Sequence, residues 1–383
     1  MKDFIYADNA ATTRIAPEVF EAMTPYLTEL YGNTSSLYKI GRENHKAKED
    51  ARRKIAELIG ASAMEIFFTS GGSESDNWAL KGTMRKLAAS GKKHMITSAI
   101  EHHAILHSAK TLEKEGFEVT YLPVDEKGRV SVESVKEAIR PDTGLVSIMF
   151  ANNEVGTIQP VAEIGAICKE AGILFHTDAV QAAGSVPIDV KAQNIDMLSI
   201  SAHKFHGPKG IGVFYCRRGV FPANLIDGGA QERGHRAGTE NLAYIIGMAK
   251  AFEIACAEME EKNARISALR DRIQEGLLKI RDSKVNGDED NRLPGNLNIS
   301  FAGVDGQSLI FDMDLAGIAV SSGSACASGS MDPSHVLLAL GVPYNMAHGS
   351  LRISLGKYNT EEEADRIIAA VTEVVANLRG EIA

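Results

Sequence analysis

Lys204 and Asp178 are the residues of this 383-residue chain whose spacing most suggests chemistry. The apolar run at 173–177 predicts a buried strand that ends at Asp178, and a second apolar run, 195–200, leads to Lys204 and a glycine-rich turn. An aspartate and a lysine at the ends of two nearby strands suit a pyridine-ring cofactor. The carboxylate keeps the ring nitrogen protonated, and the amine forms a Schiff base with the aldehyde. The ordinary alternative is a surface lysine in a loop.

A glycine-rich segment, Ser-Gly-Gly-Ser-Glu-Ser at 70–75, follows a predicted strand and opens a predicted helix. Its small side chains would let backbone N–H groups and the start of the helix approach a phosphate closely. A turn that is glycine-rich only for steric reasons is the alternative. No Gly-Lys-Ser/Thr follows, so the segment is not a Walker A loop.

His102 and His103 follow the predicted strand that ends at Thr97. A histidine at that place could stack on a cofactor ring and shuttle protons, although a histidine with a purely structural role is more common. His103 and His107 stand four residues apart and could bind a metal from one helix. Because the sequence offers no evident third ligand, we predict no metal site.

Side chains suited to orienting a ligand follow other strands. Asn152 and Asn153 come after the most apolar run, 145–150, where their amides could orient a phenolic oxygen or a carboxylate, and an ordinary turn is the alternative. Gln181 stands three residues beyond Asp178 and would face the same way on the first turn of a helix. Arg352 lies in an alternating, strand-like run, where a bidentate carboxylate clamp would be useful.

Cys326 is the one cysteine placed like a nucleophile. Cys168, Cys216 and Cys256 fit apolar patterns and are expected to be inert core residues. Cys326 stands among Gly, Ser and Ala, with no apolar neighbours to bury it, although a surface cysteine without a role would look the same. No Cys-x-x-Cys pair occurs, so neither a disulfide framework nor a zinc site is indicated, and a reducing cytoplasm fits best.

Charge and apolar pattern exclude several classes of partner. The net charge of −9 argues against a nucleic acid or an anionic membrane as the main partner. No apolar stretch approaches the roughly 18 residues that a membrane helix needs. The first residues lack the apolar core of a signal peptide. We therefore expect a cytoplasmic protein with no nucleic-acid or membrane partner.

The predicted elements form two domains, as the length of the chain also favours. Between about residues 60 and 216, short apolar runs alternate with helical patterns. Such alternation predicts an α/β domain with a mainly parallel sheet flanked by helices, with polar chemistry at the carboxyl ends of the strands. Thr360 to Glu363 forms a capping box for a last helix. We predict a large domain at 15–258 and a smaller α+β domain made of 1–14 and 259–383.

Together these segments resemble the cysteine desulfurases of the NifS/IscS type, a branch of the fold-type-I, class V aminotransferase superfamily. The segments that match are 6–13, 70–75, 101–102, 152–157, 176–181, 201–204, 236–241, 321–326 and 350–356. The resemblance implies a PLP-dependent sulfurtransferase, where PLP is pyridoxal 5'-phosphate. Such an enzyme takes sulfur from L-cysteine, leaves L-alanine and holds the sulfur as a persulfide. It then passes the sulfur to an acceptor for iron–sulfur cluster assembly or other sulfur transfer.

The resemblance also implies a role for each matching residue. Lys204 would carry the cofactor, Asp178 would pair with its ring nitrogen and His102 would stack on its face, while Cys326 would accept sulfur. Gln181 would contact the ring oxygen, and Asn153 and Arg352 would orient the substrate. The phosphate would be held by Gly72, Ser73, Ser201 and His203, with Thr239 reaching in from the other subunit of a homodimer.

Three alternatives stay open. A selenocysteine lyase or an aminotransferase could share this fold, although a plain aminotransferase needs no thiol such as Cys326. A non-catalytic sulfur-transfer platform is the third, and the presence of both Asp178 and Lys204 disfavours it. Residues 33–38, Asn-Thr-Ser-Ser-Leu-Tyr, depart from the family's common Asn-Pro-Ser pattern, and Ser73 replaces a common threonine.

Overall fold

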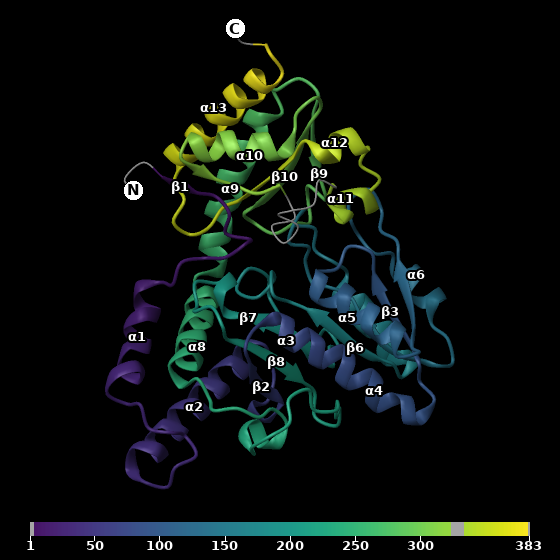
Figure 1. Ribbon diagram of the computed structural model, residues 1–383, viewed down its shortest axis with the longest axis vertical. Coiled ribbons are helices and arrows are strands. Elements are labelled where there is room, and N and C mark those ends of the chain that lie inside the picture. The colour runs from purple at the N-terminus through teal and green to yellow at the C-terminus, as the bar shows by residue number, and fades with distance from the viewer. Residues whose placement is uncertain (1–3, 323–332, 382–383) are drawn as a thin grey trace.

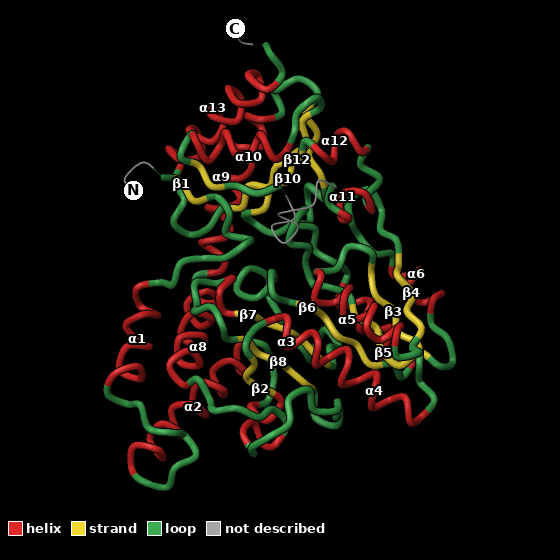
Figure 2. The backbone as a smooth tube through the Cα atoms, in the orientation of Figure 1, coloured by secondary structure: helices red, strands yellow, loops and turns green. Residues whose placement is uncertain are grey.

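The computed structural model describes residues 4–322 and 333–381. They form two units, one built on a seven-stranded sheet and the other on a three-stranded and a two-stranded sheet (Figure 1). Cys326 lies outside the described residues. Figure 2 shows the strands of the two units as separate groups, with helices and loops between them.

The larger unit is built on a seven-stranded sheet in the order β2-β8-β7-β6-β5-β3-β4. Neighbouring strands from β7 to β4 pair in parallel, whereas β8 runs antiparallel to both β2 and β7. The predicted α/β class with a mainly parallel, mixed sheet is therefore confirmed. Its strands are β2 (Ile66–Thr69), β3 (His94–Ser98), β4 (Glu118–Leu122), β5 (Thr143–Ser147), β6 (Leu174–Asp178), β7 (Met197–Ser201) and β8 (Gly212–Cys216).

Both faces of this sheet are buried, because adjacent residues of a strand point to opposite faces. Met95 and Phe214 belong to a core under helices α3 to α5, while their neighbours Ile96 and Val213 belong to a second core under α1, α2 and α6 to α8 (Figure 1). Burial on two sides explains why the strands read as continuous apolar runs. The helices are α1 (Pro17–Thr28), α2 (Lys39–Leu58), α3 (Gly72–Asn77), α4 (Thr83–Leu87), α5 (His103–Lys114), α6 (Val132–Ala138), α7 (Val161–Ala171) and α8 (Leu242–Ala257).

The smaller unit has its own core around an antiparallel sheet in the order β12-β10-β9. A short parallel pair, β1 with β11, brings residues near the start of the chain to this unit. The expected capping box forms between Thr360 and Glu363. The elements are β1 (Ile5–Tyr6), β9 (Ser283–Asn286), β10 (Asn296–Phe301), β11 (Ile318–Ala319), β12 (Ser350–Ser354), α9 (Met259–Leu277), α10 (Gly306–Leu315), α11 (His335–Ala339), α12 (Tyr344–His348) and α13 (Glu361–Leu378).

The two cores support a division into two domains, and Glu258 stands between α8 and α9, where we predict the boundary. The exact limits of the domains stay a prediction. None of the helices in the described ranges is long and apolar enough to cross a membrane.

Candidate active site

The carboxyl ends of β6 and β7 place Asp178 and Lys204 in one cavity. The two strands are parallel neighbours, so their last residues reach the same edge of the sheet; β6 ends at Asp178, and a short turn, Ala202–Lys204, follows β7. The cavity has a volume of about 320 Å³. The predicted site residues that line it are Gly72, Ser73, His102, Asn153, Asp178, Gln181, Ser201, His203, Lys204 and Arg352.

Lys204 is held by the N-terminal segment of the chain. Its Nζ donates hydrogen bonds to the carbonyl oxygens of Ala10 and Ala11, the latter at 2.9 Å. Gln181 donates to the same Ala10 oxygen at 2.9 Å. The lysine and the glutamine therefore share a wall built from residues near the start of the chain.

Asp178 is a buried carboxylate with few donors. Its Oδ1 accepts a hydrogen bond from the backbone N–H of Val180 at 2.9 Å. Burial raises the pKa of Asp178 to about 6, while the Val180 N–H and the charge of Lys204 work in the opposite direction. A cationic ligand beside this carboxyl would offset the cost of burial and keep it ionised.

His102 precedes α5 and caps it. Its Nδ1 accepts the backbone N–H of Ala104 at 3.1 Å, which leaves the proton of the neutral ring on Nε2. Burial and then the charge of Lys204 lower the pKa of His102 to about 4. His102 therefore presents a neutral ring with an N–H donor, rather than a ready base, at pH 7.

A close approach of Gly72 to the side chain of Val180 shapes the glycine-rich end of the cavity. A Cβ on Gly72 would lie 2.6 Å from Val180 Cγ2, so glycine alone fits there without a shift. Ser201 and His203 line the same cavity, and His203 Nδ1 lies 3.1 Å from Thr12 Oγ1. Gly72, Ser201 and His203 therefore belong to the wall of one cavity.

Arg352 reaches the cavity from β12 of the smaller unit. It is 1% exposed; its Nη2 pairs with Asp8 Oδ1 at 2.8 Å, and its Nη1 donates to the Asn153 carbonyl oxygen at 3.1 Å. Asn152 serves the turn instead, because its Oδ1 accepts the N–H groups of Glu154 and Val155. The cavity thus lies between the two units, with a guanidinium from one and a lysine from the other.

Thr239 does not line the cavity and is exposed, but its segment is anchored to the larger unit. Arg236 pairs with Glu74 at 2.8 Å. Glu240 accepts hydrogen bonds from Lys48 and Thr34. Thr34 belongs to the segment that departs from the family pattern, so that segment helps to position residues 236–241.

Asp76 and Glu101 are acidic residues of the cavity to which the sequence analysis gave no role. Burial raises the pKa of Glu101 to about 8, although Ser98 Oγ and the Met149 N–H donate to its Oε1. The sequence around Asp76 and Glu101 does not predict that they are buried, because aspartate and glutamate are common in exposed helices and loops. Glu101 could have been noticed because it directly precedes His102.

The three cysteines within the described ranges have the inert character expected of them. Cys168 and Cys216 are buried and Cys256 is half-buried. Burial raises the pKa of Cys168 and of Cys216 to about 12, and that of Cys256 to about 11. These thiols are therefore poor nucleophiles near neutral pH.

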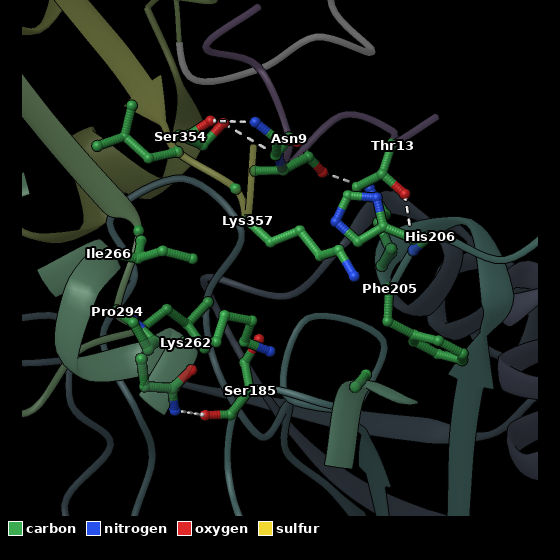
Figure 3. Close-up of a pocket in the computed structure, with 18 of the residues that line it drawn as sticks. Asn9, Thr13, Ser185, Phe205, His206, Lys262, Ile266, Pro294, Ser354 and Lys357 are labelled. Carbon is green, nitrogen blue, oxygen red and sulfur yellow. Dashed lines mark hydrogen bonds between the residues drawn. The ribbon is translucent and has the colours of Figure 1, made fainter. Parts of the chain in front are cut away.

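A second cavity, of about 100 Å³, shares Ala10, Gln181 and Lys204 with the first (Figure 3). Figure 3 shows Lys262 and Lys357 among its lining residues. Both already have partners, because Lys262 donates to the Gly184 carbonyl oxygen and Lys357 pairs with Glu258 at 3.2 Å. This cavity marks the junction of the two units.

Comparison with known proteins agrees with this geometry. Residues 5–367 match the model of the family Aminotransferase class-V. A relative named Cysteine desulfurase IscS, from Methanosarcina thermophila, is 56% identical over 375 residues, which is 98% of this chain and 93% of the relative. A relative of the same name from Clostridium botulinum is 55% identical over 385 residues, covering 99% of this chain and 96% of the relative.

A solved structure titled NIFS-LIKE PROTEIN superposes with a TM-score of 0.92 at 42% identity, covering 98% of this chain and 100% of the other. The predicted fold, type I of the PLP-dependent transferases with a larger and a smaller unit, is confirmed by this likeness. The chain belongs to the class-V aminotransferase family, whose members are PLP-dependent enzymes.

Proposed function

We propose that this protein is a cysteine desulfurase, which removes sulfur from L-cysteine, releases L-alanine and holds the sulfur as a persulfide on Cys326. The observation that carries the proposal is the cavity itself. It joins Lys204 and Asp178 at adjacent strand ends to Arg352 from the other unit. Relatives named cysteine desulfurase support it across nearly the whole chain.

The residues of the cavity fit PLP. Asp178 is a buried acid that a protonated ring nitrogen would keep ionised. Gly72, Ser73, Ser201 and His203, which line the cavity, would hold the phosphate, and His102 would stack on the ring. When bound through Lys204, the cofactor would accept the electrons of the substrate's Cα–H bond.

The chain's own residues would then divide the work. Arg352 would clamp the substrate carboxylate, and its contacts with Asp8 and the Asn153 carbonyl would fix the position of the guanidinium. Lys204 would move the Cα proton, with its Nζ oriented by the Ala10 and Ala11 carbonyls. His102 would act as a neutral donor through Nε2, since the Ala104 N–H occupies its Nδ1.

Cys326 would carry the sulfur transfer, although it lies outside the described residues. As a thiolate it would attack the substrate sulfur, so that an S–S bond forms and the Cβ–S bond breaks. The carbon fragment keeps that electron pair and, after protonation, leaves as alanine. The enzyme is left with a persulfide, which an acceptor or a reductant must discharge.

The test is the production of alanine and sulfide from L-cysteine in the presence of a thiol reductant. We expect equal amounts of the two products. Cys326→Ser should keep the absorbance of bound cofactor but lose sulfide release, whereas Cys256→Ser, the matched control, should keep both. Undiminished sulfide from Cys326→Ser would refute the persulfide mechanism. Faster turnover of selenocysteine would favour a selenocysteine lyase.

The proposal extends to partners and location. The resemblance to cysteine desulfurases implies a homodimer in which Thr239 reaches the phosphate site of the other subunit, and the exposure of Thr239 is compatible with that. Sedimentation would give the subunit number, and Thr239→Ala should weaken cofactor binding. We also expect a cytoplasmic protein that passes sulfur to an acceptor or an iron–sulfur scaffold, which cell fractionation and sulfur transfer to candidate acceptors would test.

A further inference from the structure

Asp76 is a second buried acid in the cavity that contains Asp178. It stands on α3, in the turn that follows Gly72 and Ser73, and its side chain is 2% exposed. Asp76 and Asp178 both line the cavity, and the charge of one acts on the other. The mechanism above gives Asp76 no role.

No positive charge of the described residues pairs with Asp76. Its Oδ1 has no hydrogen-bond partner there, and the nearest basic group is His176 Nε2 at 3.8 Å. His176 is fully buried, with its ring nitrogens 2.9 Å from Ser147 Oγ and 3.1 Å from Ser199 Oγ. Burial lowers the pKa of His176 to about 3, so this imidazole is neutral. Asp76 is therefore not half of an ion pair.

Asp178 is the better place for a negative charge. It accepts the Val180 N–H at 2.9 Å and feels the charge of Lys204, whereas Asp76 lacks both. Burial first, and then the charges of Asp178 and Glu101, raise the pKa of Asp76 well above its usual range, with only Ser199 acting against them. Two acids in one buried site take up one negative charge far more easily than two.

We propose that Asp76 is a positioning residue that stays an uncharged carboxylic acid and thereby keeps the single negative charge of the pair on Asp178. This inference rests on the proposed function, in which Asp178 pairs with the cofactor's ring nitrogen. A second carboxylate beside it would repel the first and compete for the same cation. A neutral acid at Asp76 would instead leave the negative charge of the pair on Asp178, which would meet the ring nitrogen.

Infrared spectroscopy of the full-length protein at pH 7 tests the charge directly. The difference spectrum between wild type and Asp76→Asn should show the carbonyl stretch of a protonated carboxylic acid that belongs to wild type alone. Glu101→Gln is the matched control, because burial raises the pKa of Glu101 to about 8 and a separate band should disappear in that variant. Only carboxylate bands in the Asp76 difference spectrum would overturn the proposal.

Cofactor affinity tests the consequence, measured through the fluorescence of Trp78, the only tryptophan in the chain. Asp76→Asn removes no charge if Asp76 is neutral, so its dissociation constant for PLP should stay within about threefold of wild type. Asp178→Asn should bind about 100-fold more weakly, as expected when one partner of a buried charge pair is lost. If Asp76→Asn does not fold, Asp76→Ser serves, since it too leaves the charge unchanged.

The outcomes separate the two proposals. An Asp76→Asn variant as weak as Asp178→Asn would overturn the inference, because Asp76 would then carry a charge that the cofactor needs. Wild-type affinity in Asp178→Asn would instead contradict the proposed cofactor site. In that case the infrared band would still decide the charge of Asp76.

Discussion

The buried pair of Arg52 and Glu232 offers the sharpest test of what holds the cavity in place. Arg52 Nη1 and Nη2 donate to the two carboxylate oxygens at 2.7 and 2.8 Å, and both side chains are 2% exposed. The same groups hold β2, since Glu232 accepts the Phe68 N–H at 3.0 Å and Arg52 donates to the Ile66 carbonyl oxygen at 2.7 Å. β2 leads directly into the glycine-rich segment of the cavity.

The expected cost of Glu232→Gln follows from this geometry. The amide keeps the size of the side chain and one acceptor oxygen, but it leaves the Arg52 guanidinium buried without its main counter-charge. Breaking a buried pair in this way costs about 3–5 kcal/mol. Since whole proteins are stable by about 5–15 kcal/mol, the loss is a large fraction of the total. At about 2 °C per kcal/mol for a large domain, the melting temperature should fall by about 6–10 °C.

Thermal and urea unfolding of Glu232→Gln, beside the double variant Arg52→Met/Glu232→Leu, measure this cost. The double variant should recover part of the loss, because apolar side chains replace both buried charges together. The recovery is incomplete because the Phe68 N–H loses its acceptor. Burial alone would raise the pKa of Glu232, but the hydrogen bonds and charge of Arg52 outweigh it and hold the pKa below its usual range. The pair's contribution is therefore present above the usual carboxyl pKa and lost as pH falls through the lowered one. A loss below about 1 kcal/mol at pH 7 would refute the reasoning, because the pair would then behave as a solvated one.

Three further outcomes are expected. Gly72→Ala should cost about 1–3 kcal/mol of stability and weaken PLP binding about tenfold, because the new Cβ would lie 2.6 Å from Val180 Cγ2. Melting curves with and without cofactor measure both effects. Unchanged affinity for PLP would contradict the close approach of Gly72 to Val180. Glu101→Gln should flatten the pH dependence of stability. The raised pKa of Glu101 makes wild type lose stability as pH rises from the usual 4.5 to about 8, and parallel melting temperatures of the two proteins from pH 5 to 8 would argue against this. Thr360→Ala should cost about 1 kcal/mol through loss of the cap of α13, measured by urea unfolding, while Glu373→Ala on the exposed face of that helix should change little.

Strand existence could be predicted from the sequence, but strand direction could not. The apolar run that becomes β8 is buried on both faces, and such a run looks the same in a parallel and an antiparallel neighbour. The place of β8 between β2 and β7 depends on pairings such as that of Phe67 with Phe214, two residues that are far apart in the chain. The direction of β8 relative to β2 and β7 is therefore set by packing rather than by the local sequence pattern.

Some residues of the site could likewise be predicted from the sequence, and others could not. Asp178 and Lys204 could be predicted because each ends a strand or follows one, and neighbouring strands share an edge. Asp76 could not, because its burial depends on α3 lying against the sheet, which no short stretch of sequence reveals. The hydrogen bond that fixes His102 as a donor also appears only in the folded chain.

Residues 7–13 explain how two separate cores can form one precise site. On one side this segment binds the smaller unit, through Asp8 with Arg352 at 2.8 Å and the Ala10 N–H with Ser354 Oγ at 2.9 Å. On the other side it binds the larger unit, since the Thr13 N–H donates to the His203 carbonyl oxygen at 2.9 Å and Lys204 donates to Ala10 and Ala11. Arg352, the proposed substrate clamp, and Lys204, the proposed cofactor lysine, are thus both positioned by this one short segment of the chain. A shift of the smaller unit would therefore move Arg352 and the wall around Lys204 together, so the geometry between clamp and lysine is preserved only while this segment stays bound to both units.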